Sequence, residues 1–283
     1  MGDDQAAVEA DVKVVWLGHA SVDVRMCGAR FVTDPVLRPR LAHLRRYAAA
    51  APLEPGPIDA VLLSHLHHDH LDLPTIRRLP PATPLVVPLG SGRAVARMTG
   101  RDAIELAPGD HIVIAGTQIT AVPASHSPGR FLRRIKGEPI GFLLERGDRI
   151  VYFAGDTDLH PVMADLPAPD AALIPIWGWG PTLGPGHLDP TRAAAATGIV
   201  RARLVVPIHW GTFAPMRLGS GAPSWLRRPA DDFVGAMRDI GLETPVALIS
   251  PSGGAVEIPR ASEGGEVREP RGRSGDDNGG GAE

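Results

Sequence analysis

Short apolar runs separated by glycine and other turn residues make up the first part of the chain. Residues 12–17, 22–26 and 29–33 are rich in β-branched side chains, with Gly18 and Gly28 in the intervening turns. Runs of this kind predict three strands of an antiparallel meander. Asp34-Pro35 ends the meander, because proline has no N–H to donate to a strand ladder.

Strand and helix signals alternate along the rest of the chain. Further strands are predicted at residues 58–64, 85–88, 112–115, 118–123, 140–145, 149–154, 171–176, 204–208 and 246–250. Helices are predicted at residues 92–98, from Pro190 to about Val200, and from Pro229 to near Gly241. Hairpins interspersed with helices predict an α/β fold with two mixed sheets face to face and helices outside, within one domain at residues 11–260.

Residues 36–57 show no clear period and predict a long, mostly irregular connection. The segment contains four arginines, interleaved with Leu41, Leu44 and Tyr47. Connections of this length are often functional or mobile. Two interpretations stay open: a solvated loop, or a lid or anionic-surface contact that could include a membrane surface through residues 38–47.

Composition narrows the class of protein. Of the 283 residues, 43% are hydrophobic but only 5% are aromatic, so the core must consist mainly of Val, Leu, Ile and Ala. The formal net charge of -3 argues against a nucleic-acid partner held by electrostatics alone. Cys27 is the only cysteine, which excludes an intrachain disulfide and fits a packing role in a reducing compartment.

The two ends of the chain and its longest apolar runs bear on localisation. Residues 1–10 are acidic and residues 261–283 are nearly devoid of apolar side chains, so both segments are predicted to be disordered. No apolar run reaches the roughly 18–20 residues of a membrane span. The first residues show no signal-peptide pattern, and a soluble cytoplasmic protein is expected.

One short stretch carries most of the candidate chemistry. His65-Leu66-His67-His68-Asp69-His70 follows a predicted buried strand directly and places four imidazoles and a carboxylate within six residues. Imidazole and carboxylate are ligands of zinc and other divalent ions. Because a loop at a strand end can direct several side chains to one point, this stretch predicts a metal site rather than a solvated turn.

Three more candidate ligands each follow another predicted strand. They are His126, Asp156 and His209, each beside turn residues. Ligands gather at strand ends in α/β sheets, so these side chains are expected to converge with the histidine-rich loop. A lone histidine after a strand is more often structural, and the prediction depends on the pattern occurring four times.

At this point the sequence resembles the metallo-β-lactamase fold superfamily. The resemblance covers about Val12 to Pro259 and is nearest to the branch of N-acyl-phosphatidylethanolamine phospholipase D and the ascorbate-6-phosphate lactonases. The residues that carry it are the H-x-H-x-D-H run, Gly18-His19-Ala20-Ser21, Thr33-Asp34-Pro35, His126, Gly155-Asp156-Thr157, His187-Leu188-Asp189-Pro190 and Ile208-His209-Trp210-Gly211. It implies a four-layer αβ/βα sandwich with a two-metal site at one edge of the sheets.

The resemblance also implies roles for individual residues. His65, His67 and His126 would hold one metal, Asp69, His70 and His209 the other, and Asp156 would bridge them. Asp69 and His187 are the implied catalytic residues, with His187 as proton donor or hydrogen-bond partner of the transition state, or else a structural group. His19 and Asp34 would orient ligands, and His68 falls outside the pattern and is expected to be exposed or to support a ligand.

Candidate substrate contacts come from two separate segments. Trp177 and Trp179 are expected to wall the pocket, with a core position as the alternative. Arg130, followed by Arg133, Arg134 and Lys136, would grip a phosphate or carboxylate, unless this segment is a solvated basic turn.

These roles predict an enzyme that hydrolyses a small anionic ester by metal-bound hydroxide. A phosphodiester, possibly phospholipid-like, is the first choice of substrate, and a lactone or other carboxylic ester at the same site is the alternative. Two zinc ions are the expected cofactors, with manganese or iron as alternatives because thiolate ligands are lacking. A di-iron oxidoreductase and a non-catalytic binding module are disfavoured.

Overall fold

Alternate residues of the strands face two different cores. In β1 (Val12–Gly18), Val14 and Trp16 point into the main hydrophobic cluster, whereas Leu17 belongs to a second cluster on the other face. In β6 (Ala60–Leu62), Leu62 faces the main cluster and Val61 the second one. Because side chains of a strand alternate between faces, a sheet with apolar residues on both faces must be covered on both.

Two large sheets supply these faces. The structure is a computed structural model that describes residues 12–49, 51–127, 137–216 and 222–260. The seven-stranded sheet has the order β16-β1-β2-β3-β6-β7-β8, with β2 (Ser21–Met26), β3 (Ala29–Thr33), β7 (Leu85–Pro88), β8 (Ala103–Leu106) and β16 (Gly254–Glu257). The six-stranded sheet has the order β14-β13-β12-β11-β10-β9, with β9 (His111–Ile114), β10 (Thr117–Pro123), β11 (Ile140–Arg146), β12 (Arg149–Phe153), β13 (Ala171–Pro175) and β14 (Val205–Ile208).

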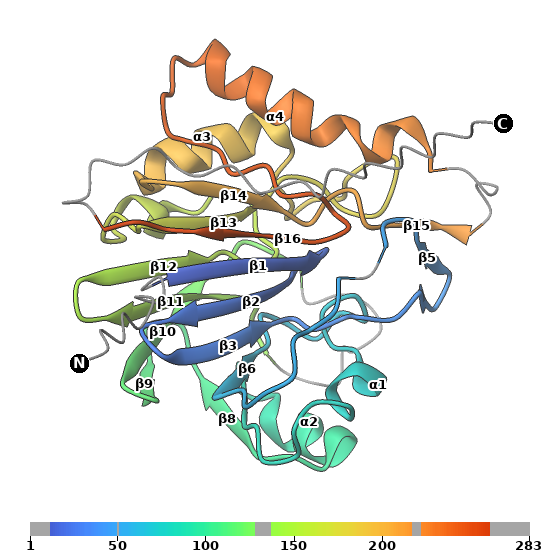
Figure 1. Ribbon diagram of the computed structural model, residues 1–283, viewed down its shortest axis with the longest axis vertical. Coiled ribbons are helices and arrows are strands. Elements are labelled where there is room, and N and C mark those ends of the chain that lie inside the picture. The colour runs from blue at the N-terminus through green and yellow to red at the C-terminus, as the bar shows by residue number, and fades with distance from the viewer. Residues whose placement is uncertain (1–11, 50, 128–136, 217–221, 261–283) are drawn as a thin grey trace, which may run out of the picture.

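Helices cover the outer faces of the two sheets (Figure 1). α1 (Leu73–Ile76) and α2 (Gly92–Thr99) lie against the seven-stranded sheet, where Ile76 and Val95 join its outer cluster. α3 (Pro190–Val200) packs against β13 and against α4 (Arg228–Asp239). The order helix, sheet, sheet, helix confirms the predicted four-layer αβ/βα sandwich. Short 3₁₀ turns occur at η1 (Pro161–Ala164) and η3 (Ser224–Leu226).

Strand direction determines where the loops of interest meet. β12, β13 and β14 run parallel, and β10 runs in the same direction because it is antiparallel to β11, which is antiparallel to β12. The carboxyl ends of β10, β12 and β14 therefore share one edge of their sheet. The N–H of Ile140 donates to the Ser64 carbonyl at 3.0 Å, which joins the end of β6 to the same edge.

Residues 36–57 differ from the predicted irregular connection. They contain β4 (Arg40–Leu41) and β5 (Leu44–Arg46), which form a three-stranded sheet with β15 (Phe213–Pro215). The prediction missed these strands because strands of two or three residues are too short to show a period. The small sheet lies at one end of the sandwich, beside β1 (Figure 1).

Two of the arginines in this segment have structural partners, which argues against a uniformly solvated or anion-binding loop. Arg38 forms a bidentate pair with the buried carboxylate of Asp72, with contacts of 2.6–3.0 Å. Arg46 is buried and donates to the carbonyls of Val36 at 2.6 Å and Leu17 at 3.2 Å. Its guanidinium lies 4.9 Å from the centre of the Phe213 ring. These bonds attach the small sheet to the main body.

The last strand of the core was predicted at the wrong place. Residues 246–250 form only an isolated bridge, between Val246 and Val205, and the strand that pairs with β1 is β16. Pro245 and Pro251 flank the predicted segment and limit its pairing, because proline cannot donate to a ladder. β8 was also missed.

The predicted disordered segments 1–10 and 261–283 lie outside the described residues, as does the basic segment at 130–136.

Candidate metal centre

Seven histidine and aspartate side chains from four loops meet at the shared strand edge. The loop after β6 supplies His65, His67, Asp69 and His70, and the ends of β10, β12 and β14 are followed by His126, Asp156 and His209. The structure thus brings together all seven residues that the sequence singled out as ligands. Among the described residues the donor atoms form four overlapping groups, and within each group all atoms lie within 4.8 Å of one another. The first contains His65, His67 and His126, and the second contains Asp69, His70 and His209 together with His19. The other two are Asp34, His65 and His70, and His126, Asp156 and His187.

The first group consists of three imidazoles. His126 Nε2 lies 3.2 Å from His67 Nδ1, and the ring centres of His65 and His126 are 4.8 Å apart. Nitrogens bound at about 2.1 Å to one tetrahedral cation lie about 3.4 Å apart. The spacing of His67 and His126 therefore suits ligands of one ion.

The second group combines a carboxylate with two imidazoles. His70 Nε2 lies 3.2 Å from His209 Nε2, and Asp69 Oδ2 lies 3.8 Å from the former and 4.0 Å from the latter. Two unprotonated ring nitrogens repel each other at such a distance unless a proton or a cation lies between them. This geometry also suits three ligands of one ion.

Asp156 lies between the two groups. One carboxylate oxygen, Oδ2, is 3.2 Å from His70 Nε2 and 4.0 Å from His65 Nε2. The other oxygen, Oδ1, is 3.1 Å from His209 Nε2. A single buried carboxylate thus faces imidazoles of both groups, which is the arrangement that a bridging ligand requires.

Backbone carbonyls fix the tautomers of two rings. His126 Nδ1 lies 2.7 Å from the carbonyl of Gly186, and His209 Nδ1 lies 2.7 Å from the carbonyl of Trp177. A carbonyl only accepts, so Nδ1 carries the hydrogen in both rings and Nε2 keeps its lone pair. Both lone pairs face the centre, as metal ligation requires.

Asp34 fixes two further rings from beneath the site. Its Oδ2 accepts from His70 Nδ1 at 2.7 Å and from the hydroxyl of Ser64. Ser64 Oγ lies 3.0 Å from His65 Nδ1, which therefore donates to it. One buried carboxylate thus holds His70 directly and His65 through Ser64, one ring of each group. The sequence indicated Asp34 but not Ser64, although this serine directly precedes the histidine cluster.

Replacing Ser64 with alanine is expected to weaken metal binding by about 10–100-fold, the usual effect of losing a partner of a ligating histidine. The variant removes the hydroxyl between Asp34 and His65 and leaves every ligand in place. Competition with a chromophoric chelator measures the affinity, and circular dichroism checks the fold. Ser252→Ala, at a position outside the site, is the matched control. Equal metal affinities of Ser64→Ala and the wild type would contradict a role of Ser64 in holding His65.

Burial keeps most of the imidazoles neutral. It lowers the pKa of His67 to about 4 and that of His209 to about 3. Burial likewise lowers the pKa of His65 well below its ordinary value and lowers that of His126. These rings are therefore uncharged near neutral pH, which is the form that binds a metal.

The buried carboxylates of Asp34, Asp69 and Asp156 are stable only with positive charge close by. Burial raises the pKa of Asp156, but the neighbouring His209 and His70 outweigh it and hold this pKa well below its ordinary value. Burial lowers the pKa of His70, but Asp156, Asp34 and Asp69 outweigh it and raise this pKa well above its ordinary value. Buried charges are stable only when paired or bound to metal, so the cluster favours a cation at its centre.

A buried ring nitrogen without a hydrogen-bond partner among the described residues supports the same fit. His65 Nε2 is buried and has no hydrogen-bond partner within the described part of the chain. Its Nδ1 is occupied by Ser64, so the free lone pair on Nε2 faces the other ligands. A buried polar atom without a partner is costly, and a metal ion would satisfy it. The residues present therefore fit divalent cations bound by nitrogen and oxygen.

His19 lies closer to the centre than its predicted orienting role required. Its Nε2 is 3.1 Å from Asp69 Oδ2, and its ring centre is 3.9 Å from that of His209. By distance alone it groups with Asp69, His70 and His209. Since Nε2 donates to Asp69, this nitrogen has no lone pair for a metal, and the contact fits a residue that orients a ligand.

Three of these residues have left-handed backbone conformations. The φ angles are 56° at His19, 33° at Asp34 and 64° at His209. Side chains other than glycine adopt this region at a cost of about 1–3 kcal/mol, and such residues cluster at functional sites. Here the strained turns direct side chains at strand ends back toward the edge of the sheets.

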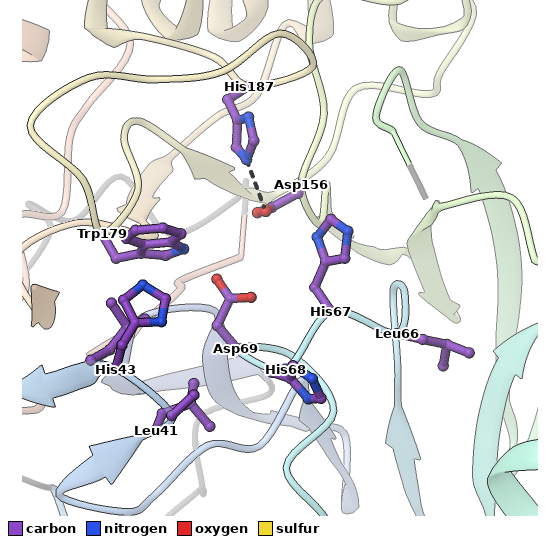
Figure 2. A pocket seen from close by; sticks show the side chains of 11 residues that line it. Leu41, His43, Leu66, His67, His68, Asp69, Asp156, Trp179 and His187 are labelled. Atoms are coloured by element: carbon purple, nitrogen blue, oxygen red, sulfur yellow. Dashed lines mark ion pairs between the residues drawn. The ribbon is translucent and has the colours of Figure 1, made fainter. Parts of the chain in front are cut away.

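A cavity of about 320 Å³ opens onto the centre. His67, Asp69, Asp156 and His187 line its inner side, and His187 Nε2 points to Asp156 Oδ2 at 3.5 Å (Figure 2). Burial lowers the pKa of His187, but its hydrogen bond to Asp156 outweighs this and raises the pKa. His68 is exposed and lies at the rim, in keeping with its place outside the ligand pattern.

Only one of the two predicted tryptophans lines the cavity. Trp179 does so, whereas the side chain of Trp177 packs against the main hydrophobic cluster and contributes its backbone carbonyl to His209. In a regular strand, residues two positions apart face the same side, but the chain leaves the strand before Trp177 and bends at Trp179, so the two side chains point in different directions. Arg130 lies outside the described residues. Sequence reasoning missed the lining residues Leu41, His43 and Leu66.

Comparison with known proteins identifies the family. The model of the beta-lactamase superfamily domain matches residues 29–210. The chain belongs to this superfamily and has the metallo-β-lactamase fold. This membership confirms the predicted fold class and places the donor cluster in a family of metal-dependent hydrolases.

Relatives and solved structures agree with this assignment. A UPF0173 metal-dependent hydrolase of Methanopyrus kandleri is 31% identical over 252 residues, covering 85% of this chain and 97% of that protein. N-acyl-phosphatidylethanolamine-hydrolyzing phospholipase D 1 of Caenorhabditis elegans is 31% identical over 254 residues, covering 79% of this chain and 69% of that protein. The structure of a metallo hydrolase from Ignicoccus hospitalis superposes with a TM-score of 0.66 at 25% identity, covering 86% of this chain and 97% of that protein. The protein is a metal-dependent hydrolase.

The described residues contain no helix that is both long and apolar enough to cross a bilayer.

Proposed function

We propose that this metal-dependent hydrolase cleaves a small anionic ester, a phosphodiester in the first place, with two zinc ions. The observation that carries the proposal is the pair of donor groups with Asp156 between them. His65, His67 and His126 would hold one ion, Asp69, His70 and His209 the other, and Asp156 would contact both. The all-nitrogen-and-oxygen donor set suits zinc and leaves manganese and iron as alternatives.

Charge supports an anionic or strongly polarisable substrate. Two divalent ions carry four positive charges, and the carboxylates of Asp69 and Asp156 return two. When bound, two such metal ions would lower the pKa of a water molecule and polarise the ester group. The excess positive charge at the inner end of the cavity would attract an anionic head group. The phospholipase D relative is consistent with a phosphodiester.

The side chains of this chain would position and protonate the substrate. His187 reaches into the cavity from the segment before α3, and its side chain keeps 24% of its exposure. From there it would donate a hydrogen bond or a proton to the leaving oxygen. Asp69 would be kept in place by His19, and the rings of His65 and His70 by Ser64 and Asp34.

Replacing His187 with alanine is expected to lower kcat by about 100-fold for an ester with an alkoxide leaving group, because general acids contribute about 10²–10⁴-fold. A p-nitrophenolate leaving group needs little protonation, so its rate is expected to change by less than about 3-fold. Metal content is expected to stay unchanged, and His111→Ala, an exposed histidine on β9, serves as the control. Equal losses for both leaving groups would indicate a structural role.

A paired assay separates the two candidate substrates. The zinc-loaded protein is offered bis(p-nitrophenyl) phosphate and a panel of lactones, with chelator-treated protein as control. Turnover of the phosphodiester supports the proposal. Turnover of lactones alone favours the carboxylic-ester alternative, which the mainly apolar cavity also suits. Turnover of neither contradicts both.

Cytoplasmic localisation is part of the proposal, supported by the single cysteine. Direct membrane contact through residues 38–47 loses support, because Arg38 and Arg46 are engaged within the protein.

A further inference from the structure

The outer half of the cavity differs in character from its inner half. The inner half carries His67, Asp69, Asp156 and His187. The outer half is formed by the turn between β4 and β5 together with the side chain of Trp179. Among the described residues that line the cavity there is no lysine or arginine. A substrate group in the outer half would therefore meet apolar and aromatic surface.

An aromatic corner defines this outer half. The rings of Trp179 and His43 meet edge to face, with centres 5.1 Å apart and an interplanar angle of 82°. Figure 2 shows both rings on the same side of the cavity, across from His67. Edge-to-face pairs hold each other in place and present a flat ring face to a ligand. A planar apolar group is the ligand that such a corner fits best.

The corner is rigidly connected to the metal centre. β15 pairs with β5, and the N–H of Met216 donates to the carbonyl of His43 at 3.0 Å. Phe213, at the start of β15, is fully buried and meets the ring of His19 edge to face at 5.3 Å. The side chain of Trp179 packs against the buried cluster that contains Leu41, Leu44 and Phe213. The wall is therefore preformed, and little ordering is needed on binding.

We propose that the outer half of the cavity, formed by the β4–β5 turn and Trp179, binds a compact, uncharged and planar apolar substituent of the ester, of the size of an aryl ring. The proposal deepens the proposed function, on which it rests. The size follows from the cavity of about 320 Å³, part of which the reacting group must occupy. The apolar character follows from the lining, because a charged substituent desolvated there would meet no lysine or arginine among the described residues.

Binding of two phosphonates to the zinc-loaded protein tests the proposal without turnover. Benzylphosphonate and methylphosphonate carry the same head group and differ in the ring. Calorimetric titration is expected to show benzylphosphonate binding about tenfold more tightly, the effect of burying part of one aromatic ring. Trp179→Ala is expected to bring the ratio of the two dissociation constants close to one while methylphosphonate binding stays within about 2-fold.

Two further variants guard against misfolding as an explanation. Ala42→Asn places a polar side chain in the wall at a residue whose φ of 49° asparagine tolerates, and it is expected to lower the ratio without disturbing the fold. Trp225→Ala truncates a half-buried tryptophan outside the cavity and is expected to preserve the ratio.

The outcomes separate this inference from the proposed function. A tenfold ratio that Trp179→Ala abolishes supports the inference, even if no ester is hydrolysed and the proposed function fails. A wild-type ratio near one, binding of neither phosphonate, or a ratio that Trp179→Ala leaves unchanged overturns the inference, while ester hydrolysis and zinc content still report on the proposed function.

Discussion

Asp156→Asn is expected to lower kcat/KM by at least about 1,000-fold, because one substitution removes the charge that faces both groups of donors. The amide keeps the shape of the side chain but not the negative charge that balances two cations. Steady-state kinetics of the best ester found for the wild type measures the effect.

Metal content of the same variant reports the cause. Elemental analysis is expected to show less than the wild-type amount of metal, since Asp156 would be shared by both ions. The matched control is Asp148→Asn, which neutralises a carboxylate whose side chain keeps 70% of its exposure. Near wild-type kcat/KM in Asp156→Asn, at full metal content, would refute a bridging role.

Chelator treatment is expected to lower Tm by about 8–16 °C. A ligand present at about 1,000 times its Kd stabilises the folded state by about 4 kcal/mol, and each kcal/mol shifts Tm by about 2–4 °C in a chain of this size. The physical reason is the cluster of buried carboxylates and neutral imidazoles, which lacks compensating charge once the cations are removed.

Differential scanning calorimetry at fixed pH and protein concentration measures the shift. Readdition of zinc, manganese or iron singly should restore Tm to an extent that ranks the metals. Asp156→Asn, with its weakened site, should show a much smaller shift on chelation. An unchanged Tm in the chelated wild type, with metal removal verified by elemental analysis, would exclude strong coupling between the site and the fold.

Strands with a clear composition were predicted well from the sequence. β3 and β7 match their predicted bounds, and α3 begins after Asp189, whose carboxylate accepts from the N–H of Arg192. These elements carry their own signals: β-branched runs between glycines, or a capping residue followed by proline. β4, β5 and β15 carry no such signal, because their pairing depends on contacts between distant segments.

In the candidate site, too, some residues carry a local sequence signal and others depend on contacts between distant segments. The donor residues were recognisable because four imidazoles in one loop are improbable for a packing role. The residues that hydrogen-bond to these donors were harder to recognise. Ser64 is an ordinary strand-end serine in the sequence, and only its position between Asp34 and His65 gives it a role.

The sequence by itself determined the class of fold, the supply of nitrogen and oxygen donors and the placement of each donor just after a strand. Local composition encodes these features, since each depends on residues within a few positions of one another. Tertiary structure alone decided which donors share a group, that Trp179 rather than Trp177 faces the cavity, and that residues 41–44 form part of its wall. Those outcomes depend on the packing of two sheets and on turn backbone angles, which fix the direction of each side chain through contacts with residues far away in the chain.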